Sequence, residues 1–397
     1  MFKRLRVILL MLVTVFIGFG LIIPVLPLMV TNAGANAFQL GLLLALYSAV
    51  SFFLSPYWGR LSDRIGRKPI LVVGLVGFAL SFLILGLAVH TIWLMYVSRI
   101  VGGAFSGAVT ATAMAYVADV TDTMDRTKGM ALAGMSIGFG FIIGPAVGGI
   151  LGGISVSLPF FVAAGLALLN ALWGLFALPE SLTPEQRQER AMQPSSGATS
   201  RWSAFEGRLK YMYLVDFVAQ FTISSLEGCL QLFEMDKIHA TSMQIGWMFF
   251  ISGIVGALIQ GGIVRRYVTH GREVPTLYIG LFVSALGLVL LVFSSNFATA
   301  ALYMTIFGAG NTVIKPTLTS VITKETRVGQ GLANGLLSSM DSLARMVGPV
   351  FATLIFEVHM NLPFFVAAVV AILAMVLVLR YQMTVQTEKT LLSPKQS

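Results

Sequence analysis

Long uncharged, apolar runs recur along the whole of this 397-residue sequence and constrain its fold more than any other feature. Two of them, at 41–58 and 70–89, flank the segment GRLSDRIGRKP, which places five charges within eleven residues. A run of about 18 or more apolar residues is long enough to cross a bilayer as a helix. Only 11% of the residues are charged, whereas soluble domains have about a quarter. We therefore expect an integral membrane protein.

The runs predict an all-α membrane protein with twelve spanning helices of about 20 residues each. The first six are expected near 5–30, 38–58, 70–90, 92–118, 128–152 and 157–178. The other six are expected near 209–233, 244–266, 275–294, 297–322, 329–356 and 361–381.

The N-terminal run has one alternative interpretation. A basic start precedes it, and Ala33, Ala35 and Ala37 follow it with the spacing of a signal-peptide cleavage site. However, the uncharged stretch from Val7 to Val30 is longer than the apolar core of about 7–15 residues that a signal peptide has. We interpret it as the first spanning helix.

The basic residues are strongly biased to one side of the predicted membrane. Of the 26 lysines and arginines, 22 fall in the termini and in the connectors on the N-terminal side, and only Lys237 falls on the other side. Because positive residues are retained in the cytoplasm, we expect both termini to be cytoplasmic, in the inner (cytoplasmic) membrane of the cell. The formal net charge of +9 then reflects topology, and no nucleic-acid partner is expected.

The sequence contains an internal duplication. LPFFVAA occurs at 158–164 and at 362–368, and Gly-Pro occurs at 144–145 and at 348–349, in both cases 204 residues apart. Parallel six-helix repeats are an architecture of secondary transporters.

The duplication and the polar segment between its copies predict four parts. The segment before the seventh span carries a helix start, with Thr183 as N-cap, Pro184 after it and Gln186 completing a capping box, and we interpret it as a tether. The parts are an N-terminal half at 1–178, a cytoplasmic linker at 179–208, a C-terminal half at 209–381 and a cytoplasmic tail at 382–397.

The charged segment after the second span resembles the loop signature of the major facilitator superfamily. The residues that carry this resemblance are Gly59, Asp63, Arg64, Gly66, Arg67 and Lys68. We expect the glycines to allow tight turns and close helix approach, and a buried Asp63 to pair with the arginines and face a helix N-terminus. The resemblance implies a gating latch, whereas the alternative is a loop that only anchors topology. The corresponding loop after the eighth span keeps Gly271 and Arg272 but has no matching aspartate, so we expect the latch to be asymmetric.

The fourth span carries Arg99, Gly103 and Gly107, which resemble the superfamily's fourth-helix motif. An arginine at the centre of a span costs about 2.5–3.5 kcal/mol on insertion scales. We therefore expect Arg99 to face the bundle interior and to have a partner. A purely structural arginine that bonds backbone carbonyls is the alternative.

The fifth span contains a stripe of small residues around a proline, namely Gly140, Gly144, Pro145, Gly148 and Gly149. The four-residue spacing makes one helix face flat enough for close backbone contact. Ordinary packing explains this stripe whatever the function. The pattern also resembles the antiporter motif of twelve-helix drug:proton antiporters, the branch with multidrug and tetracycline exporters, and GFGLIIPVLP in the first span resembles the same branch.

Carboxylates within spans are functional candidates, since burying them is costly. We expect Glu227 to couple protons, as the resemblance to multidrug exporters implies, although it could be an outer-vestibule residue without a special role. Asp341 and Arg345 are spaced to pair on one helix face, either as a structural pair or as a coupling element. Lys315 is expected to snorkel near the cytoplasmic end. Candidate substrate-binding residues are Glu227, Gln231, Tyr47 and Asn311.

The remaining polar residues indicate no catalytic or cofactor chemistry. A single cysteine, Cys229, excludes an internal disulfide, and no Cys/His spacing suits a metal. We expect no enzyme and no cofactor, but proton-coupled efflux of lipophilic, cationic or zwitterionic drugs by a protein that works as a monomer among membrane lipids. The alternatives are a narrow exporter, for tetracycline or a metabolite, and a non-transporting membrane sensor on the same scaffold.

Overall fold

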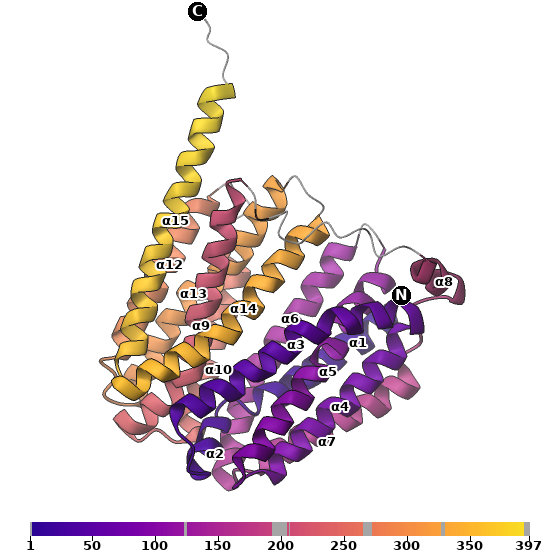
Figure 1. Ribbon diagram of the computed structural model, residues 1–397, viewed down its shortest axis with the longest axis horizontal. Coiled ribbons are helices and arrows are strands. Elements are labelled where there is room, and N and C mark those ends of the chain that lie inside the picture. Colours follow the sequence, from indigo (N-terminus) through magenta and orange to yellow (C-terminus); the bar gives the residue numbers. More distant parts are fainter. Residues whose placement is uncertain are drawn as a thin grey trace, which may run out of the picture. The chain divides into compact units, whose positions relative to one another are not determined.

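The chain is described by a computed structural model that covers residues 2–122, 125–192, 205, 207–264, 272–326 and 330–392. Within these residues every regular element is a helix, as the composition predicts (Figure 1). The loop after the eighth span, on which the predicted asymmetry rests, lies outside them except for Arg272.

Most of the predicted apolar runs become long helices, although several of these helices extend beyond the predicted bounds. The first eight helices are α1 (Phe2–Gly20), α2 (Leu26–Asn32), α3 (Ala37–Ile65), α4 (Arg67–Leu87), α5 (Ile92–Val120), α6 (Arg126–Ile154), α7 (Leu158–Ala177) and α8 (Pro184–Met192). The others are α9 (Leu209–Ile238), α10 (Ser242–Ile259), the π-helical η2 (Gln260–Val264), α12 (Glu273–Leu291), α13 (Phe297–Glu325), α14 (Gln330–Val358) and α15 (Leu362–Leu392).

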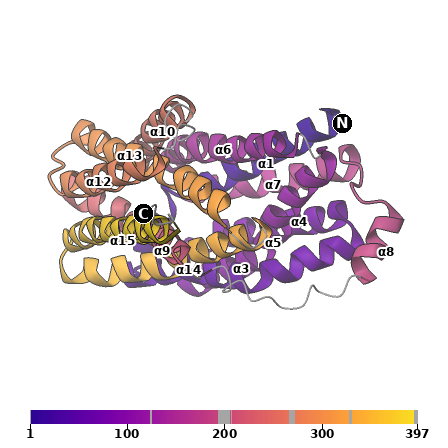
Figure 2. The same cartoon turned by 90° about the horizontal axis from the view of Figure 1, so that it is seen from above.

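The chain forms two compact units. Unit 1 comprises Met1–Gly197 with Glu234–Phe250, and unit 2 comprises Ala198–Phe233 with Ile251–Ser397. In unit 1, α4 packs against α5 and α7, and α1 packs against α6; in unit 2, α12 packs against α13 and α15 (Figure 2). The boundaries of the predicted halves, linker and tail stay predictions.

The predicted first span is two helices rather than one. α1 ends at Gly20 and α2 begins at Leu26, with Pro27 in its first turn. Between them the backbone forms turn bonds such as Ile23 N to Gly20 O at 3.2 Å. Pro24 lacks the N–H that would continue α1, which explains the break that the sequence reading missed.

Nine helices among the described residues are long and apolar enough to cross a membrane, so the protein is a multi-pass membrane protein. The predicted first, seventh and eleventh spans do not meet that criterion. α9 and α14 carry charged residues within their length, including Asp216, Glu227 and Asp341. The number of twelve crossings therefore stays a prediction.

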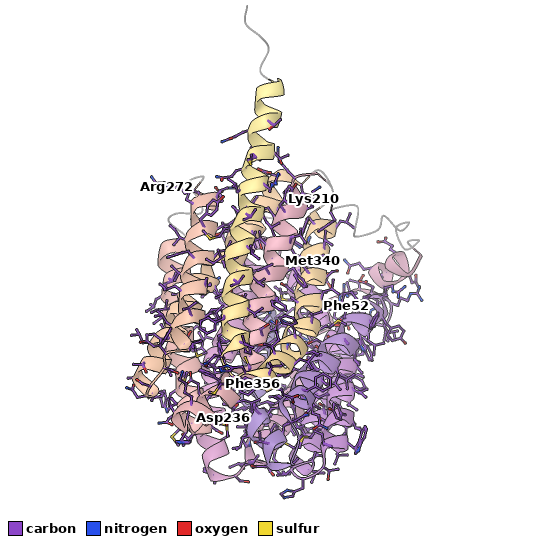
Figure 3. All side chains as sticks on the ribbon, turned by 60° about the vertical axis from the view of Figure 1, so that its left-hand side comes forward. Phe52, Lys210, Asp236, Arg272, Met340 and Phe356 are labelled. Carbon is purple, nitrogen blue, oxygen red and sulfur yellow. The ribbon has the colours of Figure 1, made fainter. Side chains whose placement is uncertain are left out.

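Two smaller expectations are met at helix ends. Thr183 N donates to Gln186 Oε1 at 3.0 Å and Gln186 N donates to Thr183 Oγ1 at 3.3 Å, which is the capping box predicted for α8. In unit 2, Lys210 at the start of α9 and Arg272 before α12 lie at the same end (Figure 3), in agreement with the predicted clustering of basic residues.

Candidate functional site

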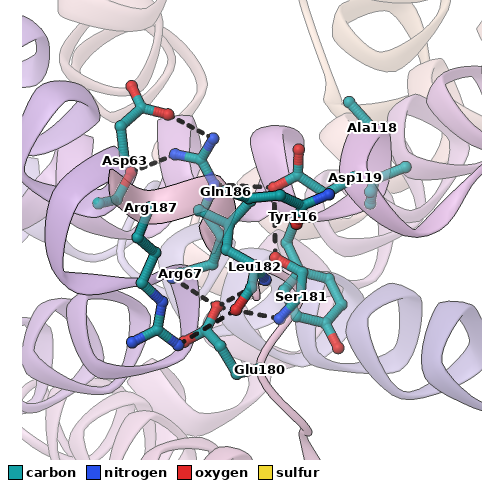
Figure 4. Close-up of polar contacts among 12 residues, drawn as sticks. Asp63, Arg67, Tyr116, Ala118, Asp119, Glu180, Ser181, Leu182, Gln186 and Arg187 are labelled. Carbon is teal, nitrogen blue, oxygen red and sulfur yellow. Dashed lines mark hydrogen bonds and ion pairs between the residues drawn. The ribbon is translucent and has the colours of Figure 1, made fainter. Parts of the chain in front are cut away.

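Arg67 is the centre of a polar cluster at one end of unit 1 (Figure 4). It is the first residue of α4, and only 5% of its side chain is exposed. Its guanidinium donates to Asp63 Oδ1 at 2.7 Å, to Asp119 Oδ2 at 2.9 Å and to Ser62 Oγ at 2.5 Å. One cation thus joins the ends of α3, α4 and α5. We call Ser62, Asp63, Arg67, Asp119 and Glu180 the latch cluster.

Glu180, which follows α7, caps the N-terminus of α4. Its carboxylate accepts bonds from Arg67 N at 2.8 Å and from Lys68 N at 3.2 Å, and it lies 3.5 Å from the Arg187 guanidinium of α8. An anion at a helix N-terminus satisfies free N–H groups and the helix dipole. Gly66 makes this approach possible, since its φ is +118° and a Cβ there would collide with the Glu180 carboxylate. Glu180 therefore links α4 to α7 and α8.

Three expectations for the latch cluster are wrong: the burial of Asp63, the acid at the helix N-terminus and the role of Gly59. Asp63 is 37% exposed, whereas Asp119 is 7% exposed and is the buried acid. The acid at the helix N-terminus is Glu180, not Asp63. Gly59 lies inside α3 with nothing near its Cβ position in the described part of the chain, so it forms neither a turn nor a close approach. Arg64 is exposed on the same helix.

The contacts of Asp119 and Glu180 with Arg67 were missed because both acids lie far from Arg67 in the sequence. Asp119 is 52 residues from Arg67, and Glu180 is 113 residues from it. The sequence offered only a weak signal: Asp119 follows the fourth predicted span, and Glu180 follows the sixth.

Arg99 is buried in α5, as predicted, and its guanidinium lies 5.8 Å from the centre of the Tyr47 ring of α3. Among the described residues its Nε and Nη2 atoms have no hydrogen-bond partner. Tyr47 in turn donates to Ser106 Oγ at 2.9 Å. The expected partner of Arg99 is therefore an aromatic ring rather than a carboxylate or a backbone carbonyl.

Small residues on α5 and α6 allow close helix contacts. A Cβ on Gly103 would lie 2.6 Å from Tyr47 O, and one on Gly107 would overlap Ser55 of α3. On α6, a Cβ on Gly144 would lie 2.6 Å from Gly20 Cα, and one on Gly140 would lie 2.5 Å from Phe16 Cβ.

The rest of the α6 stripe continues this contact. A Cβ on Gly148 would overlap Leu21, and one on Gly149 would lie 2.5 Å from Ser242 O at the start of α10. The carbonyl of Pro145 faces Gly246 of α10. The flat face predicted for α6 is thus a packing surface for α1 and for the first turns of α10.

Unit 2 contains a charged cluster on three helices. Lys315 of α13 donates to Asp216 of α9 at 2.8 and 2.9 Å and to Asp341 of α14 at 2.7 and 2.8 Å. The Asp216 side chain is only 1% exposed. When both carboxylates are ionised, the single ammonium leaves one negative charge in excess, which a proton or a cationic compound can neutralise. We call these residues the Lys315 cluster.

This cluster corrects the expected partners of Asp341 and Lys315. Asp341 bonds to Lys315 on a neighbouring helix instead of pairing with Arg345 one turn away, and Lys315 does not extend alone to the membrane surface. Arg345 instead lies near enough to act electrostatically on Glu227 of α9. The helical spacing suggested a pair within α14, but the ion pair that forms joins α14 to α13.

The candidate binding residues of unit 2 are less open than expected. Asn311 is buried, and its amide lies 3.5 Å from both Ala219 O and Thr222 Oγ1 of α9. Gln231 is also buried, whereas Glu227 on the same helix is partly exposed. Of these three candidate binding residues, Glu227 is therefore the most exposed.

Comparison with known proteins places the chain in a family. The sequence model of the Major Facilitator Superfamily matches residues 8–329 and 217–397. The chain belongs to the Major Facilitator Superfamily. This membership agrees with the loop signature around Arg67 and with a non-enzymatic transporter.

Individual members of the Major Facilitator Superfamily resemble the chain over nearly its full length. Multidrug resistance protein 2 of Bacillus subtilis is 31% identical over 91% of this chain and 90% of its own. Quinolone resistance protein NorA of Staphylococcus aureus is 27% identical, and the match covers 92% of this chain and 93% of NorA. The crystal structure of the human organic anion transporter TETRAN is 25% identical, with a TM-score of 0.71, and the match covers 95% of this chain and 99% of that one.

Proposed function

We propose that this protein exports lipophilic, cationic or zwitterionic compounds across the cytoplasmic membrane in exchange for protons, by alternating access. The similarity to multidrug resistance protein 2 and to quinolone resistance protein NorA over about nine-tenths of each chain carries the choice of substrate class. Both termini lie in the cytoplasm, and the monomer is the working unit.

The excess carboxylate charge in unit 2 supports the coupling to protons. Glu227 is partly exposed and within electrostatic reach of Arg345, and the Lys315 cluster has one negative charge in excess when both its carboxylates are ionised. A site of this kind accepts either a proton or a cationic compound, and this competition is the basis of exchange. Glu227 takes a proton from outside, releases the compound there and loses the proton inside.

A one-for-one exchange with a proton removes the electrical cost of exporting a monovalent cation. Moving one positive charge outward against 100 mV costs about 2.3 kcal/mol. An inward proton cancels this electrical cost, so the drive that remains is the pH gradient, about 1.36 kcal/mol per pH unit.

Dye efflux into inverted membrane vesicles tests the proposal. We expect a lipophilic cation to accumulate when a pH gradient is imposed and to leave when nigericin removes it. Glu227→Gln should abolish this accumulation. The matched control is Asp236→Asn, which removes an exposed carboxylate from the same helix and should leave transport unchanged.

Two results would contradict the proposal: transport of no lipophilic cation, or full transport by the Glu227→Gln variant. Transport of only one compound from a broad panel would favour the narrow exporter instead.

A further inference from the structure

A cavity outside the latch cluster opens at the same end of unit 1. Its volume is about 420 Å³. Two cations line it, Arg4 of α1 and Lys68 of α4, together with an apolar wall of Val7, Phe176, Ala177 and Pro179. Three helices therefore bring positive charge and apolar surface to one pocket, which we call the Arg4–Lys68 pocket.

The charges of these two side chains are not compensated within the described part of the chain. Neither the Arg4 guanidinium nor the Lys68 ammonium forms an ion pair or a side-chain hydrogen bond there. Glu180, whose carboxylate accepts bonds from Arg67 N and Lys68 N, is already paired with Arg187. The pocket therefore keeps a net positive charge.

The second repeat shows how the same position is neutralised by the chain itself. Arg208 precedes α9 and is 204 residues from Arg4, the offset of the internal duplication. It donates to Glu325 Oε2 at 2.9 Å, and Tyr381 donates to the other oxygen of Glu325 at 2.6 Å. Glu325 ends α13, whereas the matching position at the end of α5 is the uncharged Thr121. Of the two acids beside Thr121, Asp119 is bound by Arg67 and Asp122 is exposed. Unit 1 thus has the cation, Arg4, but no acid at the position that matches Glu325.

The apolar wall continues along a face of α7 suited to lipid chains. Phe176 is 86% exposed, and Leu169 and Leu172 are exposed on the same helix. Their spacing of three and four residues places them on one face. A small soluble anion would bind the two cations but would leave this apolar face uncovered.

We propose that the Arg4–Lys68 pocket binds the phosphate of an anionic phospholipid, whose acyl chains lie along the exposed face of α7. Basic pockets between spanning helices bind anionic headgroups in this way. The lipid supplies the negative charge that Glu325 supplies in unit 2. The binding does not depend on the proposed efflux activity.

Native mass spectrometry of the purified, delipidated full chain tests the site. The protein is titrated with phosphatidylglycerol and, separately, with phosphatidylcholine of identical acyl chains. We expect phosphatidylglycerol to bind more tightly, and the double variant Arg4→Gln, Lys68→Gln to lose roughly tenfold or more of that affinity. Each single variant should lose part of it, and Phe176→Ala should weaken both lipids equally.

The matched control is Lys210→Gln with Arg380→Gln, which removes two exposed cations from unit 2 and should change the affinity less than twofold. Excess glycerol 3-phosphate should fail to displace the lipid. Equal binding of the two lipids to the unsubstituted protein would overturn the proposal. An unchanged affinity in the double variant, an equal loss in the control, or displacement by glycerol 3-phosphate would also overturn it.

Discussion

At the scale of single residues, burial separates the two acids that bind Arg67. Asp119 is nearly inaccessible, whereas Asp63 is more than a third exposed. A buried charge that loses its partner costs several kcal/mol, while an exposed ion pair contributes at most about 1 kcal/mol. Asp119 therefore stabilises the fold of unit 1, and Asp63 remains available for a role in gating.

This difference predicts the order of two substitutions. Asp119→Asn should lower the free energy of unfolding by about 3 kcal/mol, since it weakens a buried charged bond, whereas Asp63→Asn should lower it by about 1 kcal/mol or less. Thermal unfolding in detergent measures both. Asp63→Asn should still impair efflux with nearly normal expression. Full efflux would mean that the loop only anchors topology.

The Lys315 cluster gives a second prediction at this scale. Lys315→Gln leaves two carboxylates facing each other, so it should destabilise unit 2, and adding Asp341→Asn should relieve part of that loss. We expect a coupling energy of about 1–3 kcal/mol in the double-mutant cycle, measured by thermal unfolding.

The control for this cycle is Lys324→Gln with Asp341→Asn. Lys324 pairs with Glu273 instead, so these two effects should add within about 0.5 kcal/mol. Additive effects of Lys315 and Asp341 would show that their contact contributes nothing to stability.

Ion pairs in the two clusters could be predicted only where the partners lie close together in the sequence. Asp63 and Arg67 are four residues apart on adjoining helix ends, so their pairing was readable as a local contact. Lys315 and Asp216 are 99 residues apart. Helical spacing alone favoured Arg345 as the partner of Asp341, because a sequence pattern reports neighbours along one helix and not across two.

At the scale of helices, hydrophobic length predicted most elements, because a lipid-facing helix must be long and apolar whatever its neighbours are. The break between α1 and α2 was not predicted, since an apolar composition hides a backbone interruption. The glycine stripe of α6 was predicted, but its partners were not. These are Phe16 and Gly20 of α1, Leu21 directly after α1, and Ser242 of α10.

The contact between α1 and α6 predicts a position-dependent effect of a single methyl group. Gly144→Ala should destabilise the protein, because the new Cβ would lie 2.6 Å from Gly20 Cα and the two helices would have to separate. Gly134→Ala on the same helix meets nothing among the described residues and should be neutral or slightly stabilising, since alanine is the better helix former. Melting temperatures in detergent decide this, and equal shifts for both variants would contradict the close contact.

At the scale of the whole molecule, the two repeats place ion pairs at similar helix ends with opposite signs. The first residue of α4 is Arg67, which pairs with Asp119 of α5; the first residue of α12 is Glu273, which pairs with Lys324 of α13. The duplication therefore preserves the location of the interaction and not its chemistry. The asymmetry expected between the two loops stays a prediction.

The distribution of basic residues predicts which ends of the helices face the cytoplasm, and the single cysteine makes this testable. Cys229 is buried, so Cys229→Ser gives a background without thiols. In that background, Ser295→Cys places a thiol in the exposed connector between α12 and α13, and Gln188→Cys places one on the exposed surface of α8.

With 22 of 26 basic residues on the N-terminal side, α8 should lie in the cytoplasm and the connector between α12 and α13 should lie outside. A membrane-impermeant maleimide should therefore label the Ser295→Cys variant in intact cells, and the Gln188→Cys variant only after the cells are permeabilised. The reverse pattern would mean that the charge bias does not set the orientation of this chain. The direction of the proposed exchange would then be inverted, because Glu227 would take its proton from the cytoplasm.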